Sequence, residues 1–180
     1  MGFEARMKRL LHLLVGLTAF ASASAEAASG NTVVITGNAQ ARVVQAISIV
    51  NTAALNFGSI AQPATVGSVT LSPTGAVSSA GGAAGNEAIT QTGLGRTPGV
   101  FRVTATTGAA FSLSGPATFN VRRGGGTTMS VTGLTFSVQP LSSTASTTTY
   151  QINVGGTLNL AANQRVGSYT GTYAVTAVYQ

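Results

Sequence analysis

The sequence YTGTYAVTAVY at residues 169–179 alternates between two kinds of side chain. The members of one set are aromatic or apolar, apart from one glycine: Tyr169, Gly171, Tyr173, Val175, Ala177 and Tyr179. The other set is mostly threonine. Because successive side chains of a strand point to opposite faces, this stretch predicts a long strand with one apolar face. Such a strand must be paired along both edges, or it leaves an open edge to which another chain can add.

Similar runs precede this stretch at short intervals. They are rich in Val, Ile, Thr and Phe, and Gly, Pro and Asn separate them. These runs predict strands at residues 30–38, 39–50, 55–60, 67–73, 100–106, 110–114, 118–121, 128–131, 134–138, 149–154 and 157–160. Short strands separated by turn signals at intervals of about eight to twelve residues are typical of a β-sandwich. We therefore predict an all-β antiparallel sandwich.

Three segments between these runs are predicted to be loops or turns. Residues 74–98 are rich in Gly, Ser and Ala and predict a long surface loop, with a short strand around 88–90 as its one regular element. Residues 143–149 predict a polar loop, and the glycine pair at 155–156 predicts a turn. A loop as long as 74–98 is uncommon in a compact domain and is often functional.

The first 25 residues have the three parts of a secretory signal peptide. Basic residues occur within 1–9, an apolar run covers 10–21, and small residues surround the cleavage position. The apolar run has about twelve residues, whereas a membrane-spanning helix needs about 20. We therefore predict a signal-peptide helix at 1–25, with 27 as an alternative end. Residues 26–38 are then an N-terminal arm, and residues 39–180 are the sandwich domain.

The residues that catalysis and metal binding require are nearly absent. The chain has 180 residues, 7% of them charged, a net charge of +6, and neither cysteine nor aspartate. His12 and Lys8 leave with the signal peptide, after which Glu87, and Glu26 if cleavage follows residue 25, are the remaining carboxylate side chains. These residues cannot build a catalytic triad, a glycosidase carboxylate pair, or a zinc or calcium site. We expect no enzymatic activity, no metal and no cofactor.

Two short motifs carry weak functional signals. GLGRTPG at residues 93–99 lacks the lysine and the glycine spacing of a phosphate-binding loop, so we interpret it as a surface turn. Arg122 and Arg123 precede three glycines and are expected at a solvated hairpin tip, with anion binding as the alternative. The other arginines are scattered, without the basic stripe and stacking platforms that nucleic-acid binding needs.

From residue 39 onward the chain resembles the bacterial domain-of-unknown-function family 4402, which consists of secreted β-sandwich proteins. The resemblance rests on the order of LNFGSI (55–60), VTLSPTG (69–75), FRVTATTGAAFSLSGP (101–116), GGGTTMSV (124–131), VGGTLNLAANQ (154–164) and VGSYTGTYAVTAVY (166–179). That family in turn is similar to the subunits of chaperone–usher pili. The likeness implies an incomplete immunoglobulin-like sandwich, although this chain lacks the disulfide that many pilins have.

The resemblance to pilins also implies a mechanism of assembly. TVVITGNAQARVV at residues 32–44 resembles the N-terminal extension that completes the next subunit, so that Val33, Ile35 and Gly37 are the inward set of a donor arm. The residues implied to meet a partner on the C-terminal strand are Tyr169, Tyr173, Val175, Ala177 and Tyr179. The implied partners are other copies or related subunits, a periplasmic chaperone and an outer-membrane usher. The implied location is the periplasm in transit and then the cell surface.

Two functions therefore remain open. The first is a structural subunit of a surface fibre, with adhesion as an additional role. The second is a self-complete monomeric sandwich that binds a carbohydrate or surface ligand through residues 74–98. They differ in whether residues 32–36 pair within their own domain and cover the terminal strand, or leave its edge open to another subunit.

Overall fold

The computed structural model describes residues 34–84 and 95–180. The chain divides into two compact units, residues 1–42 and residues 43–180. The predicted signal-peptide helix lies outside the described residues. Residues 34–38 were part of a predicted strand, but they form none, and their side chains are exposed. That part of the prediction is wrong, because β propensity alone does not form a strand without a ladder partner.

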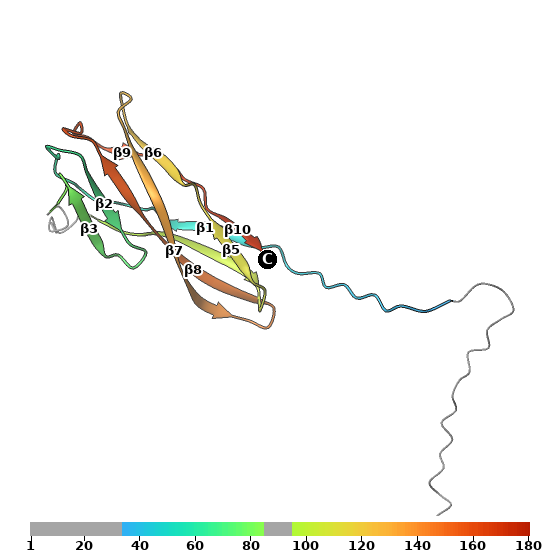
Figure 1. Cartoon of the computed structure of the whole chain (residues 1–180). Coiled ribbons are helices and arrows are strands. Elements are labelled where there is room, and N and C mark those ends of the chain that lie inside the picture. The colour runs from blue at the N-terminus through green and yellow to red at the C-terminus, as the bar shows by residue number, and fades with distance from the viewer. Residues whose placement is uncertain (1–33, 85–94) are drawn as a thin grey trace, which may run out of the picture. The chain divides into compact units, whose positions relative to one another are not determined.

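The second unit consists of antiparallel strands, and none of its described residues is helical (Figure 1). Its described part contains β1 (Ser48–Ala53), β2 (Gly67–Leu71), β3 (Val77–Gly81), β4 (Gly99–Thr106), β5 (Phe111–Ser114), β6 (Thr118–Arg123), β7 (Thr128–Ser143), β8 (Thr147–Leu160), β9 (Tyr169–Thr170) and β10 (Thr176–Tyr179). Eight strands form one sheet with the order β1-β4-β8-β7-β6-β9, in which β2 pairs with β8 and β3 with β2. β5 and β10 form a separate two-stranded sheet. The all-β prediction is confirmed.

Alternation of apolar and polar residues determines which face of the large sheet is buried. In β4, Phe101 and Val103 are buried, whereas Arg102 between them is exposed. In β8, Ile152 and Val154 are fully buried. Ile152 lies opposite Phe101 in the ladder between the two strands. The four buried residues form one core cluster, as the alternation of their strands predicts.

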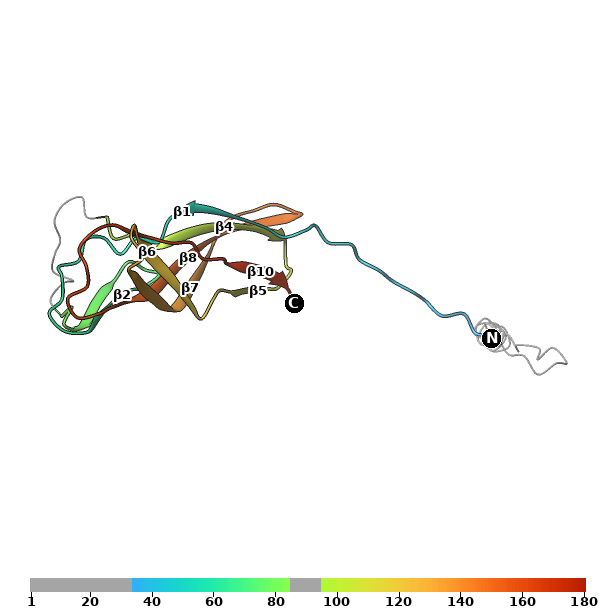
Figure 2. The same ribbon diagram turned by 90° about the horizontal axis from the view of Figure 1, so that it is seen from above.

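The small sheet covers this cluster. β5 and β10 pair from Phe111 with Tyr179 to Ser114 with Thr176. Figure 2 shows this pair on one side of β4 and β8. The apolar side chains that pack on the cluster from β1, β5, β10 and the residues next to them include Ile47, Ile49, Phe111, Leu113, Tyr173, Val175 and Ala177. The core therefore lies between the large and the small sheet.

Residues 169–179 form two short strands instead of the predicted continuous one. β9 pairs with β6, and β10 pairs with β5. Between them, Gly171 passes so close to β6 that an added Cβ would lie 3.1 Å from the Cα of Val121. The stretch thus changes from the large sheet to the small one, which interrupts the ladder. The alternation remains visible beyond this point, because Val175 and Ala177 still pack on the core.

Two predicted pairs of short strands are each one long strand. β7 includes both 128–131 and 134–138, and β8 includes both 149–154 and 157–160. The turn predicted at 155–156 is wrong, because both glycines lie inside β8. At this point β8 passes the end of β2, and Gly155 lets the backbone of residues 71–73 approach it. The predicted loop at 143–149 is accordingly shorter, since β7 ends at Ser143 and β8 begins at Thr147.

Three further strand and loop predictions need correction. Of residues 39–50, only 48–50 belong to a strand, β1. Residues 55–60 form no strand apart from an isolated bridge between Asn56 and Thr97. The Asn56 side chain instead accepts a hydrogen bond from the Gly58 N–H at 2.8 Å, and Gly58 has φ 70°, which bends the chain into a turn. The predicted loop at 74–98 contains β3, while its predicted strand at 88–90 lies outside the described residues.

Candidate functional site

Among the described residues, β1 and β10 each have one edge without a ladder partner next to the core. β10 pairs along one edge with β5, and no other strand of residues 34–84 and 95–180 pairs with its second edge. Within the same residues β1 pairs with β4 alone. β1 and β10 contact each other but share no ladder. We call the unpaired edges of these two strands together the β1–β10 edge. Unpaired N–H and C=O groups along such an edge can accept another strand.

The inner side chains at the β1–β10 edge are apolar. Ile47 and Ile49 on the β1 side, and Val175 and Ala177 on the β10 side, pack against the core cluster of the large sheet. Val178, on the outer face of β10, is 53% exposed. A strand added to this edge would gain apolar contacts with the inner set as well as ladder hydrogen bonds.

Tyr179 attaches the end of β10 to the large sheet. Its hydroxyl donates to the Gln45 carbonyl at 2.9 Å and accepts from the Thr106 N–H at 2.8 Å. The Gln45 N–H in turn donates to Oγ1 of Thr106 at 3.0 Å. This predicted partner-binding residue therefore holds three segments of its own domain together.

Tyr173 lies among aromatic rings. Its ring stacks on Phe119, with 4.9 Å between centroids, and meets Phe101 edge-on at 5.9 Å. Among the described residues, its hydroxyl is the one buried side-chain N or O atom without a hydrogen-bond partner. Burial raises the pKa of Tyr173 above its ordinary value of 10.0, because the charged phenolate would be poorly solvated there.

We expect replacement of Tyr173 by phenylalanine to stabilise the protein by about 1 kcal/mol, because leaving a buried polar group unpaired costs about 1–3 kcal/mol. The raised pKa adds a pH dependence. In the wild type, keeping Tyr173 neutral contributes to the free energy of unfolding. This contribution is fully present below the unfolded pKa of about 10 and is lost as the pH rises through the higher folded pKa. The variant should therefore lose less stability above pH 10. Urea unfolding at pH 7 and pH 11 measures both effects.

The matched comparison is Tyr179→Phe. It removes the same hydroxyl group, but in Tyr179 this group has hydrogen-bond partners. This variant should be less stable by about 1–3 kcal/mol, since the buried Thr106 N–H and the Gln45 carbonyl both lose a partner. Equal destabilisation by the two substitutions would show that the Tyr173 hydroxyl is satisfied in solution.

The structure describes two of the three residues predicted for the donor arm. Val33 lies outside the described residues. Ile35 and Gly37 belong to the first unit, form no strand, and are exposed, with 85% of Ile35 accessible. A Cβ added to Gly37 would meet no atom within 4 Å. The pairing of this arm with another strand thus stays a prediction.

A cavity of about 580 Å³ lies between two loops of the second unit. One wall is residues 54–63, which follow β1, and the other is residues 164–171, which follow β8 and include β9. Side chains of β6, β7 and β8 that also line this loop cavity are Phe119, Val121, Met129, Leu158 and Leu160. None of the described residues of 74–98 lines it. The alternation in the sequence could not predict this cavity, because irregular loops far apart in the chain form it.

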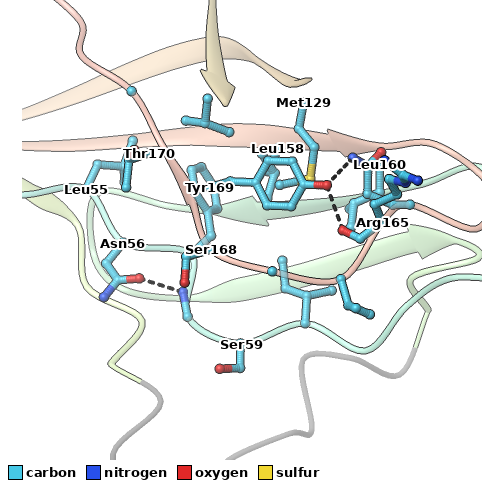
Figure 3. A pocket seen from close by; sticks show the side chains of 18 of the residues that line it. Leu55, Asn56, Ser59, Met129, Leu158, Leu160, Arg165, Ser168, Tyr169 and Thr170 are labelled. Carbon is cyan, nitrogen blue, oxygen red and sulfur yellow. Dashed lines mark hydrogen bonds between the residues drawn. The ribbon is translucent and has the colours of Figure 1, made fainter. Parts of the chain in front are cut away.

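A buried glutamine fixes one wall of the loop cavity. Gln164 accepts from the Ala161 N–H at 3.2 Å, and its amide donates to the Tyr169 hydroxyl at 2.8 Å. The Tyr169 hydroxyl donates to the Arg165 carbonyl at 2.6 Å, as Figure 3 shows. Gln62 joins the two walls by donating to the Gln164 carbonyl at 3.1 Å. These bonds give the irregular wall a defined backbone, and Tyr169 belongs to it.

The charges around the loop cavity are all positive among the described residues. The chain has no aspartate, and its glutamates, at positions 4, 26 and 87, all lie outside the described ranges. Arg165 lines the cavity and is exposed. Arg123 packs against the lining residue Gly167. Arg96 donates to the carbonyls of two residues in the 54–63 wall, Phe57 at 3.1 Å and Ser59 at 3.3 Å.

In the part of the chain that the structure describes, there is no helix long and apolar enough to cross a membrane. Within residues 34–84 and 95–180, no three His, Cys, Asp or Glu side chains gather where they could hold a metal ion.

Comparison with known proteins identifies a family. No curated protein and no solved structure matches this chain. The sequence profile described as "Domain of unknown function (DUF4402)" matches residues 47–179, which include the β1–β10 edge and both walls of the loop cavity. Because this match covers most of the chain, the protein belongs to the DUF4402 family.

Proposed function

We propose that this protein is an exported structural subunit of a bacterial surface fibre, assembled by strand complementation between neighbouring subunits. The observation that carries the proposal is the β1–β10 edge, where two edges without a ladder partner lie over an apolar core. The lack of reactive groups in the predicted mature sequence agrees with a structural role.

In this role the second unit would be an incomplete immunoglobulin-like sandwich. Among its described residues, the large sheet has eight strands, whereas the sheet covering the core has two, β5 and β10. A further strand along the free edge of β10 would extend the small sheet by a ladder. Its inward side chains would lie next to Ala177 of β10, which already packs on the core.

The N-terminal arm of another copy is the proposed added strand. Val33, Ile35 and Gly37 have the period of two that one face of a strand requires. The described part of the arm forms no strand of its own, and Ile35 is exposed. Because a head-to-tail contact that does not close generates a filament, such pairing would produce a fibre. A periplasmic chaperone would cover the same edge before an outer-membrane usher assembles the subunits.

Deletion of residues 28–37 tests this proposal and leaves both predicted cleavage positions intact. Fibres from the wild type are expected to persist as a ladder in SDS at room temperature and to yield monomers on boiling, because completed sandwiches dissociate slowly. The deletion variant should yield monomers at every temperature, since it cannot complete a neighbour. Normal ladders from the deletion variant would contradict the proposal.

A matched pair of substitutions tests the predicted inward set of the arm. Ile35→Asp places a charge among the inward residues, whereas Val34→Asp places it on the opposite face of the same strand. The two wild-type side chains are equally accessible, at 85% and 84%. We expect Ile35→Asp to abolish the ladders, because a buried unpaired carboxylate is costly, and Val34→Asp to retain them.

A further inference from the structure

We propose that the loop cavity binds an acidic sugar residue, with Arg165 contacting the carboxylate. The cavity is distinct from the β1–β10 edge, so that strand complementation and ligand binding can occur on the same subunit. This inference does not depend on fibre formation, because all the residues involved belong to the second unit.

The size and framework of the cavity suit a small ligand. Its volume of about 580 Å³ lies within the usual range of ligand sites, roughly 300–1,000 Å³. The hydrogen bond from Gln62 to the Gln164 carbonyl joins its two walls, and the bonds of the Gln164 amide and the Tyr169 hydroxyl hold the 164–171 wall in place. A site whose backbone is fixed before binding loses less entropy when the ligand enters.

The lining combines the two kinds of surface that a sugar ring needs. Phe57, Tyr169 and Tyr173 provide aromatic surface for the apolar C–H faces of a ring. Asn56 and Ser168 provide an amide and a hydroxyl for its oxygen atoms (Figure 3). A purely aliphatic ligand would leave these polar groups unpaired.

Charge selects an acidic sugar over a neutral one. Neither the guanidinium of Arg165 nor that of Arg123 forms an ion pair with a side chain of the described residues, which contain no aspartate or glutamate. The Arg165 backbone is fixed by the bond from the Tyr169 hydroxyl to its carbonyl at 2.6 Å, so its side chain extends from a defined position. Arginine binds carboxylates through two parallel hydrogen bonds, which neutral sugars cannot match.

The test is titration of the isotope-labelled protein, after signal cleavage, with D-glucuronic acid, followed by amide chemical shifts. D-Glucose and acetate serve as comparison ligands, because they carry the ring without the charge and the charge without the ring. We expect saturable shifts at residues 54–63 and 164–171 with glucuronate, and binding of glucose and acetate at least about fivefold weaker. Absence of saturable shifts at these residues, or acetate binding as tight as glucuronate, would overturn the proposal.

Arg165→Gln should weaken glucuronate binding about tenfold or more, because it removes a charge-assisted pair of hydrogen bonds. The matched control is Arg102→Gln, which removes the same charge from an exposed position of β4 that does not line the cavity. This control should change the dissociation constant less than twofold, and both variants should unfold at the wild-type temperature. An equal loss in the two variants would show that net charge alone attracts the ligand, and would overturn the assigned role of Arg165.

Discussion

Replacing Gly155 by alanine is expected to lower the free energy of unfolding by about 3 kcal/mol, the upper end of the usual cost of overpacking. An added Cβ would overlap the Leu71 carbonyl oxygen and would lie 2.7 Å from the Pro73 nitrogen. Both are backbone atoms, one in the last residue of β2 and one two residues later, so they cannot move aside as the end of a flexible side chain could. Chemical denaturation of the purified domain measures the loss.

Gly124→Ala is the control for this substitution. Gly124 lies in the turn after β6, and an added Cβ there would meet no atom within 4 Å. We expect a change of less than about 0.5 kcal/mol, because the same methyl group is added without a clash. If Gly155→Ala were equally mild, β2 and β8 would be less closely packed in solution than in the structure.

The same glycine explains one limit of prediction from the sequence. Two adjacent glycines between apolar runs are a reasonable turn signal, because glycine permits many backbone conformations. In this fold Gly155 and Gly156 instead lie inside β8, at a place where neighbouring residues leave little room for a side chain. Gly155 faces the backbone after β2, and an added Cβ on Gly156 would lie 3.1 Å from a methyl group of Leu134. Only the tertiary contacts distinguish this use of glycine from a turn.

Strands with strict alternation could be predicted well. The run at 100–106 became β4 with one added residue, and the run at 110–114 became β5 with one fewer. In both, burial on one face and exposure on the other stabilise the strand that the pattern indicates. Residues 39–44 carry valines as well, yet form no strand. A local pattern indicates which residues suit a strand, but it does not indicate whether a neighbouring strand is available to pair with them.

The candidate sites show the same limit. The alternation at 175–179 correctly indicated the inner residues Val175 and Ala177, since they need only one buried face. It could not indicate that β9 and β10 belong to different sheets, because the crossing at Gly171 depends on β6. The loop cavity had no local signal at all, because its two walls are far apart in the sequence and meet only after folding.

Truncation of Ile152 to alanine should destabilise the second unit by about 2–5 kcal/mol, the usual range for deleting a large aliphatic side chain from a core. Ile152 is fully buried in β8, within the cluster that contains Phe101 and Val154. Removing it forfeits apolar burial and leaves a cavity between the large and the small sheet. Thermal or urea unfolding of the isolated subunit measures the loss.

The matched substitution Ile35→Ala separates stability within a subunit from contact between subunits. Ile35 is 85% exposed, so the same truncation should change the unfolding free energy of the isolated subunit by less than about 0.5 kcal/mol. If Ile35 belongs to the donor arm, its truncation should nevertheless lower the temperature at which SDS-resistant ladders dissociate. Destabilisation of the isolated subunit by Ile35→Ala would instead show that the arm pairs within its own domain, which would favour a self-complete monomer.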